Sequence, residues 1–151
     1  MDSPSPLLDW TASPYVAAFF AFDSVAQDAE EVCIYGILRD IVHPRSSKQH
    51  LFVVGPYLRS HPRHYSQQSR YSMCVRTEGE DYAFVPHEQA LPEALGQSGE
   101  IFKLRIPAGQ RLSALKDLDL MNINPFSVYG SEDSLIRTIA RRECLFQHWD
   151  L

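Results

Sequence analysis

The strongest constraint on the fold lies near the start of the chain, where a polar junction runs directly into an apolar segment. Residues 7–14 read Leu-Leu-Asp-Trp-Thr-Ala-Ser-Pro, and residues 16–22 are entirely apolar. Ser13 and Pro14 predict an N-cap followed by proline at the first helical position, where its missing N–H costs nothing. A helix that is apolar on nearly every face belongs in a core. The junction before it is therefore predicted to be held rigidly.

The junction residues Asp9, Trp10 and Thr11 admit two interpretations. The free N–H groups and the positive dipole end of the following helix would suit an anionic ligand. Alternatively, Asp9 and Thr11 only cap the helix, and Trp10 fills a gap in the packing. Spacing alone leaves both open.

Composition limits the class of protein. A chain of 151 residues that is 44% hydrophobic predicts one globular domain, 1–151, with a genuine core. Its net charge of −5 argues against a general nucleic-acid binder. No apolar run has membrane-spanning length and no signal peptide is recognisable, so we expect no membrane association. Three cysteines without a close-spaced pair predict reduced core residues of a cytoplasmic protein, at Cys33, Cys74 and Cys144.

The charge is unevenly distributed along the chain. Residues 41–77 contain no Asp or Glu but carry six Arg or Lys and four His. This basic segment suggests a local anionic partner, although a solvated loop with scattered arginines explains it equally well. Its arginines alternate with Tyr57, Tyr65 and Tyr71, which would permit stacking on nucleic-acid bases. The overall negative charge argues against nucleic acid as the partner.

Hydrophobic patterning predicts an α+β fold: a single mixed domain with short, mostly antiparallel strands and about three helices. Apolar or alternating runs predict strands over residues 32–38, 51–54, 70–75, 82–85, 101–106 and 126–129. Beyond the first helix, helices are expected over residues 110–120 and from the Ser131 cap to about residue 147. The helix over residues 110–120 should place Leu112, Leu115 and Leu118 on one stripe. The helix that follows Ser131 should turn Leu135, Ile136, Ile139 and Leu145 inward.

Several familiar sites are missing from the sequence. It has no phosphate-binding glycine loop, no dinucleotide fingerprint and no paired-cysteine zinc motif. His61 and His64 have metal-ligand spacing without a third ligand nearby, so no metal site is predicted. The remaining polar candidates gather at the first helix, at the start of a middle strand and at the last helix: Asp9, Trp10, Thr11, Ser13, Gln67, Gln68, Ser69, Tyr71 and Glu132.

Three sequence blocks resemble the FRG domain family. Residues 4–21 read Pro-Ser-Pro-Leu-Leu-Asp-Trp-Thr-x-Ser-Pro-x-x-Ala-x-x-Phe-Ala. Residues 63–71 read Arg-His-Tyr-x-Gln-Gln-Ser-x-Tyr. Residues 122–135 read Asn-Ile-Asn-x-Phe-Ser-Val-Tyr-Gly-Ser-Glu-Asp-Ser-Leu. The blocks occur in the family's order, and the resemblance implies a bacterial or phage protein.

The family takes its name from a Phe-Arg-Gly element that precedes the first block. That tripeptide occurs nowhere in this chain, which therefore resembles the C-terminal two-thirds of an FRG domain. The resemblance implies that a missing N-terminal segment or a protein partner completes it, or that the chain forms a homo-oligomer.

FRG domains are in turn distantly similar to ADP-ribosyltransferases, which implies an ADP-ribosyltransferase-like fold with NAD as cofactor. The similarity assigns Glu132 as the catalytic carboxylate and Gln67 or Gln68 as the group that orients the ribose. It assigns Thr11 and Ser13 as the hydroxyl element, beside Trp10. Asp9 and Tyr71 complete the expected cofactor site. The anchoring arginine of that superfamily has no counterpart here.

Two functions from different classes follow. The first is an NAD-binding, ADP-ribosyltransferase-like domain that transfers ADP-ribose or cleaves NAD. The second is a non-catalytic protein-interaction module, a truncated FRG domain acting on a host or defence protein. The second predicts an exposed apolar edge near residues 7–10.

Overall fold

The computed structural model describes residues 6–26, 28–38, 41–42, 49–55, 61–87 and 101–146. The chain divides into two compact units. The first comprises Met1–Trp10, Tyr35–Tyr57 and Ser69–Leu104; the second comprises Thr11–Ile34, Leu58–Gln68 and Arg105–Leu151. Each unit is described separately below.

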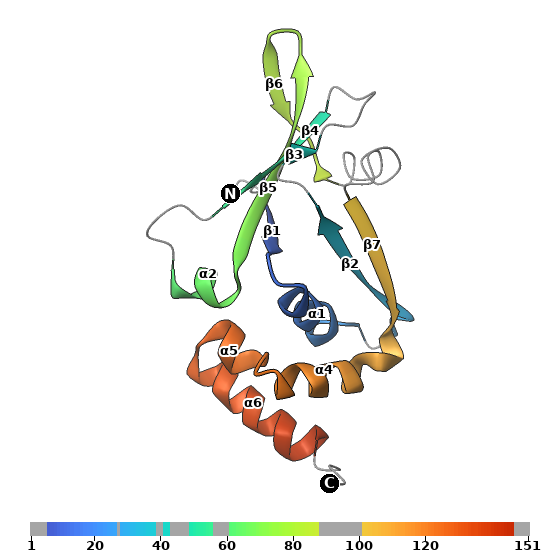
Figure 1. Ribbon diagram of the computed structural model, residues 1–151, viewed down its shortest axis with the longest axis vertical. Coiled ribbons are helices and arrows are strands. Elements are labelled where there is room, and N and C mark those ends of the chain that lie inside the picture. The colour runs from blue at the N-terminus through green and yellow to red at the C-terminus, as the bar shows by residue number, and fades with distance from the viewer. Residues whose placement is uncertain are drawn as a thin grey trace. The chain divides into compact units, whose positions relative to one another are not determined.

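The first unit is built on a sheet whose central strand is β5 (Ser69–Glu78) (Figure 1). The strand order is β1-β5-β4-β3, from β1 (Leu8–Thr11), β4 (Gln49–Val54) and β3 (Ile41–Val42), and β6 (Asp81–Phe84) also pairs with β5. The pairings of β5 with β4 and with β6 are antiparallel. β5 and β6 form a hairpin in which Glu78 is opposite Asp81, and Gly79 adopts the positive φ that such tight turns require.

One face of this sheet is buried because alternate residues of β5 are small or apolar. Ser72 and Cys74 are completely buried on that face, and Cys74 is opposite Leu51 of β4. The core cluster of the unit consists of Leu51, Cys74, Val85 and Ile101.

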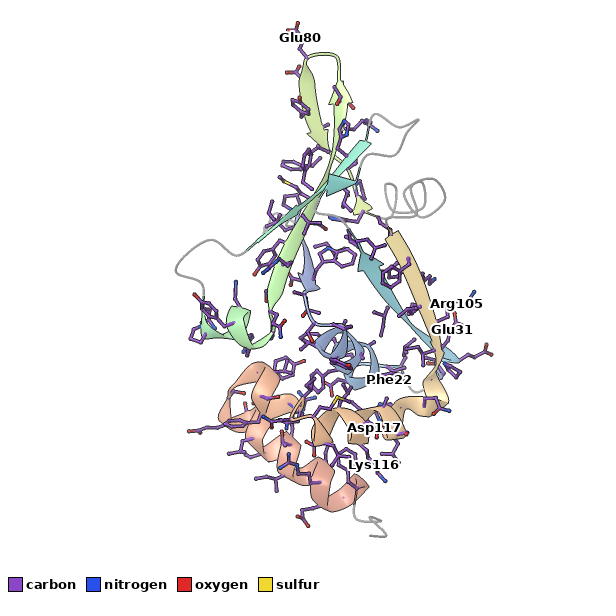
Figure 2. All side chains as sticks on the ribbon, in the orientation of Figure 1. Phe22, Glu31, Glu80, Arg105, Lys116 and Asp117 are labelled. Atoms are coloured by element: carbon purple, nitrogen blue, oxygen red, sulfur yellow. The ribbon has the colours of Figure 1, made fainter. Side chains whose placement is uncertain are left out.

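A separate two-stranded sheet pairs β2 (Glu31–Ile37) with β7 (Ile101–Pro107). Position 36 of β2 requires a glycine, because a Cβ there would come within 2.1 Å of Phe102 Cζ. Nearer the other end of the ribbon, Arg105 Nη2 donates to Glu31 Oε1 at 2.6 Å, and Figure 2 shows the two side chains together.

The second unit contains the helices. They are α1 (Pro14–Asp23), α2 (Pro62–Ser66), the short 3₁₀ turn η1 (Ala108–Gln110), α4 (Arg111–Leu120), α5 (Pro125–Tyr129) and α6 (Glu132–Leu145). In this unit α1 packs against α4, and α5 packs against both α2 and α6. The core cluster of this unit consists of seven buried residues: Phe19, Phe22, Val32, Leu115, Leu118, Val128 and Phe146.

Most elements expected from the sequence are confirmed. The fold is mixed α+β, with antiparallel strands and three long helices. Ser13 caps α1 by accepting from the Val16 N–H at 3.3 Å, and Pro14 is the first helical residue. Ser131 caps α6 in the same way, and Ser134 completes a reciprocal capping box. The sequence leaves residues 63–69 as a turn or a helix, and the one-turn helix α2 forms there. Helix α5 is also a one-turn segment, too short for hydrophobic periodicity to reveal.

The strand predicted over residues 126–129 is wrong, because this segment forms helix α5. Asn124 caps the helix with its side chain, Pro125 occupies its first position, and Gly130 ends it at φ 67°. These are the start and stop residues of a helix. They determine the conformation more strongly than the β-forming tendency of Phe, Val and Tyr.

The inward orientation predicted for α6 is also wrong where the structure describes it. Leu135, Ile136 and Ile139 are 41%, 65% and 52% exposed. The buried residues of the helix are instead the polar Ser134 and Thr138, at 2% and 4% exposure. The side chain predicted to turn inward at position 145 lies outside the described residues.

Two smaller expectations also fail. Leu115 and Leu118 are buried as expected, but Leu112 of the same α4 stripe is 44% exposed. Of the three cysteines expected in the core, Cys74 is buried, Cys33 is half-buried and Cys144 is exposed. None of the three is in a disulfide. No helix among the described residues is both long and apolar enough to cross a membrane.

Replacing Phe19 with alanine should destabilise the second unit strongly. Phe19 is 1% exposed at the centre of the core, so Phe19→Ala removes a buried ring and leaves a cavity that costs about 3–5 kcal/mol. Urea denaturation followed by circular dichroism measures the change. Tyr15→Ala is the matched control, since Tyr15 lies on the same helix and is 54% exposed. Equal losses in the two variants would contradict this description of the core.

Candidate functional site

Four of the predicted site residues come together in the second unit, where the chain before α1 meets the turn after α2. The Thr11 hydroxyl donates to the Gln67 carbonyl at 2.6 Å, and the Ala12 N–H donates to the Gln68 carbonyl at 2.9 Å. The Thr11 oxygen also accepts from the Ser13 N–H at 3.1 Å. Sequence-distant segments are thus joined by hydrogen bonds that satisfy the junction's own polar groups.

The two glutamines have different environments. The Gln67 side-chain amide is half-buried and donates to the Val128 carbonyl at 3.3 Å, beside the Ser66 hydroxyl, which donates to the same carbonyl at 3.1 Å. Gln68 is exposed and adopts φ 48°, a left-handed conformation that reverses the chain between α2 and β5. Gln67 therefore ties this turn to α5, whereas the Gln68 side chain faces solvent.

Tyr129, which the sequence analysis did not single out, is the aromatic centre of this region. Its ring makes edge-to-face contacts with Phe19 and Phe20, with centroids 6.1 and 6.0 Å apart. The guanidiniums of Arg63 and Arg137 lie 5.9 and 5.8 Å from its centroid. Burial raises the pKa of the Tyr129 phenol above its ordinary value, and the Asp23 carboxylate raises it further.

Asp23, at the C-terminus of α1, holds α6 in place. Its side chain is 3% exposed and forms ion pairs with Arg137 Nη2 at 3.0 Å and with Arg141 Nη2. Removing one partner of a buried ion pair leaves an uncompensated charge, so such a pair strongly constrains geometry. The spacing of the two arginines, four residues apart on a helix, was the only signal of this contact in the sequence.

Glu132, the predicted catalytic carboxylate, is the first residue of α6 and is exposed. It stands three residues after Tyr129. Glu132 and Asp133 both occupy the first helical turn, where negative charge stabilises the helix dipole. No cation among the described residues lies within ion-pair distance of either one, whereas Arg142, near the other end of α6, is paired with Asp119 at 2.8 Å.

The remaining predicted residues belong to the first unit. Trp10 donates from Nε1 to Ser72 Oγ at 2.6 Å, and Ser72 Oγ lies 2.8 Å from His87 Nε2. Ser72 is completely buried and His87 is 9% exposed, so this polar chain is an internal contact of the sheet. Asp9 is exposed on β1, and Tyr71 is half-buried on β5 opposite Val54. Leu7 and Leu8 are 43% and 39% exposed.

Other parts of the predicted chemistry give little to build on. Much of the basic segment lies outside the described residues, including Arg45, Lys48 and Arg59. Among the described residues, no three His, Cys, Asp or Glu side chains are close enough to hold a metal ion. A cavity inside the second unit, beside Phe19 and Thr138, holds about 10 Å³. That is room for about one water molecule and not for a nucleotide.

Together the fold and the site define a small mixed α+β protein with a hydrogen-bonded junction before its first helix. Residues 1–30 of the chain match the family model described as the FRG domain. The resemblance is thus confirmed over the first of the three blocks, and the other two lie outside the match. No curated protein and no solved structure matches the chain, and the ADP-ribosyltransferase likeness finds no support.

Thr11→Val should lower the free energy of unfolding by about 2 kcal/mol. Valine keeps the shape but leaves the Gln67 carbonyl without its donor and the Ser13 N–H without its acceptor, and unmade buried hydrogen bonds cost about 1–3 kcal/mol. Urea denaturation is the measurement. Thr77→Val, at a half-buried threonine of the first unit, is the control and should cost less. An unchanged midpoint for Thr11→Val would free the hydroxyl for a ligand role.

Proposed function

We propose that the chain is a protein-interaction module whose docking face is the outward side of α6. The proposal is carried by an inversion in that helix: among its described side chains, two polar residues are buried while three large apolar residues are exposed. Ser134, Thr138 and Arg141 face the unit, whereas Leu135, Ile136 and Ile139 face solvent. Fully burying one large aliphatic side chain gains about 1.5–3 kcal/mol, so exposing three of them forgoes considerable stability.

The inward contacts explain why the helix cannot rotate to bury those side chains. The Thr138 hydroxyl donates to the Ser134 carbonyl at 2.9 Å and accepts from the Phe126 N–H at 3.0 Å. Arg137 and Arg141 are bound to Asp23. Rotation would break the bond from the Phe126 N–H to Thr138 and both contacts with Asp23. The apolar side is therefore held outward, as expected of a surface that binds another protein.

The junction residues also support binding over catalysis. The hydroxyls of Thr11 and Ser13 and the amide of Gln67 all make hydrogen bonds within the second unit. Side chains engaged in this way stabilise the scaffold and are not available to orient a substrate without first breaking those contacts.

Photo-crosslinking tests the docking face. With p-benzoylphenylalanine in place of Ile136, irradiation in cells that naturally express the chain should give one adduct of defined mass. Mass spectrometry identifies the partner, and the purified partner should then bind the wild-type chain at least about tenfold more tightly than Ile136→Ser/Ile139→Ser. The matched control carries the photo-crosslinker in place of Asp117, an exposed residue of α4 (Figure 2). No adduct at Ile136, or the same adduct at both positions, would refute the proposal.

A second candidate function is NAD binding with release of nicotinamide. It is favoured by the two guanidiniums that flank Tyr129, since Arg63 has no carboxylate partner among the described residues and could bind a pyrophosphate. In this reading Glu132 stabilises the positive charge that develops on the ribose as nicotinamide leaves. The exposed Gln68 side chain keeps the role that the resemblance implies for it, which is to orient the ribose.

Nicotinamide release from NAD, followed by chromatography, tests this second function. The expected result is release by the wild-type chain and its loss in Glu132→Gln, which removes the charge and keeps the volume. Glu143→Gln, near the other end of the same helix, is the matched control and should retain release. If the wild-type chain releases no nicotinamide, or if Glu132→Gln is as active as wild type, the catalytic reading is wrong.

A further inference from the structure

We infer that the docking face of α6 takes an amphipathic helix whose apolar residues are flanked by Lys or Arg. This inference rests on the proposed function and specifies the chemistry of the partner. It concerns the outward seam of α6, which we define as Glu132, Ile136, Ile139 and Glu143, together with the neighbouring Leu135 and Asp133.

The spacing of the seam selects the shape of the partner. Its four residues are separated by four, three and four positions, so they lie along one side of the helix. Steps that alternate between four and three residues are the spacing of a heptad seam, which accommodates a second helix in side-by-side packing. The isoleucines occupy the middle of the seam and the carboxylates its two ends, which gives an apolar centre with a polar rim.

The charges of α6 select the sign of the partner's flanking residues. Its three arginines are all neutralised within the second unit, Arg137 and Arg141 by Asp23 and Arg142 by Asp119. The carboxylates of Glu132 and Asp133 are exposed, and no described cation lies within ion-pair distance. The helix dipole accounts for part of their stabilisation, yet they remain negative at the edge of an apolar strip. Complementary flanking cations would both steer the encounter and fix the register.

The same charges disfavour a second copy of this chain as the occupant. In a parallel pair, Glu132 and Asp133 of one copy would lie beside the same carboxylates of the other. Like charges directly opposed across a helix pair are destabilising, so this self-pairing works against itself, whereas a partner with flanking cations gains from the same charges.

Two synthetic peptides test the inference with the full chain. They share one leucine seam at heptad spacing and differ only in flanking residues, Lys in the first and Glu in the second. Fluorescence anisotropy should show the Lys-flanked peptide binding at least about tenfold more tightly than the Glu-flanked one, and salt should weaken it. Glu132→Gln/Asp133→Asn should reduce this preference severalfold. Asp117→Asn, which removes a carboxylate from α4, should leave it unchanged.

The serine pair Ile136→Ser/Ile139→Ser separates failure of the charge argument from failure of the docking face. Both positions are exposed, so the variant should keep the urea midpoint of the wild-type chain. Equal binding of both peptides, abolished in the serine variant, would overturn the inference and leave the docking face intact. Binding unaffected by the serine variant would overturn both. Binding of neither peptide, or self-association that the serine variant abolishes in sedimentation, would overturn the inference.

Discussion

The carboxylate of Asp23 fixes the arrangement on which the second unit depends. It ends the most buried helix and accepts two arginines from α6, so it determines which side of α6 turns inward. The Thr138 hydroxyl adds a hydrogen bond on the same side, where it accepts from the Phe126 N–H of α5. Polar contacts of this kind have strict geometry, unlike apolar packing, which tolerates many orientations. The exposed position of Ile136 and Ile139 is a consequence of that geometry.

The junction before α1 has a related role. Thr11 and Ala12 bind the turn formed by Gln67 and Gln68, and Gln67 in turn binds α5. Residues that form the most conspicuous motif of the sequence thus link three segments that are far apart along the chain. A motif rich in hydroxyls and amides fits this structural use as well as it fits ligand binding, because both require fixed donors and acceptors. Its match to the FRG domain is compatible with either use.

Local signals in the sequence were reliable where short-range chemistry decides the outcome. Ser13–Pro14 and Ser131 marked two helix starts, and the alternating or apolar runs marked β2, β4, β5, β6 and β7. The helix start at Asn124–Pro125 and the stop at Gly130 were equally local, but the β-forming residues between them obscured α5. The candidate site was found in part: Thr11, Ser13, Gln67 and Gln68 do come together, whereas Tyr129 and Asp23 were missed.

The sequence by itself determined the fold class, most element positions and the helix caps, because these follow from residue-level conformational preferences and from contacts within a few positions. Tertiary structure alone decided which face of α6 is buried. Hydrophobicity predicted the side with Leu135, Ile136 and Ile139, and the structure buries Ser134 and Thr138 instead. The deciding contacts join α6 to Asp23, more than a hundred positions earlier in the chain. No pattern within the helix encodes a partner at that distance, so only the folded chain reveals the apolar surface.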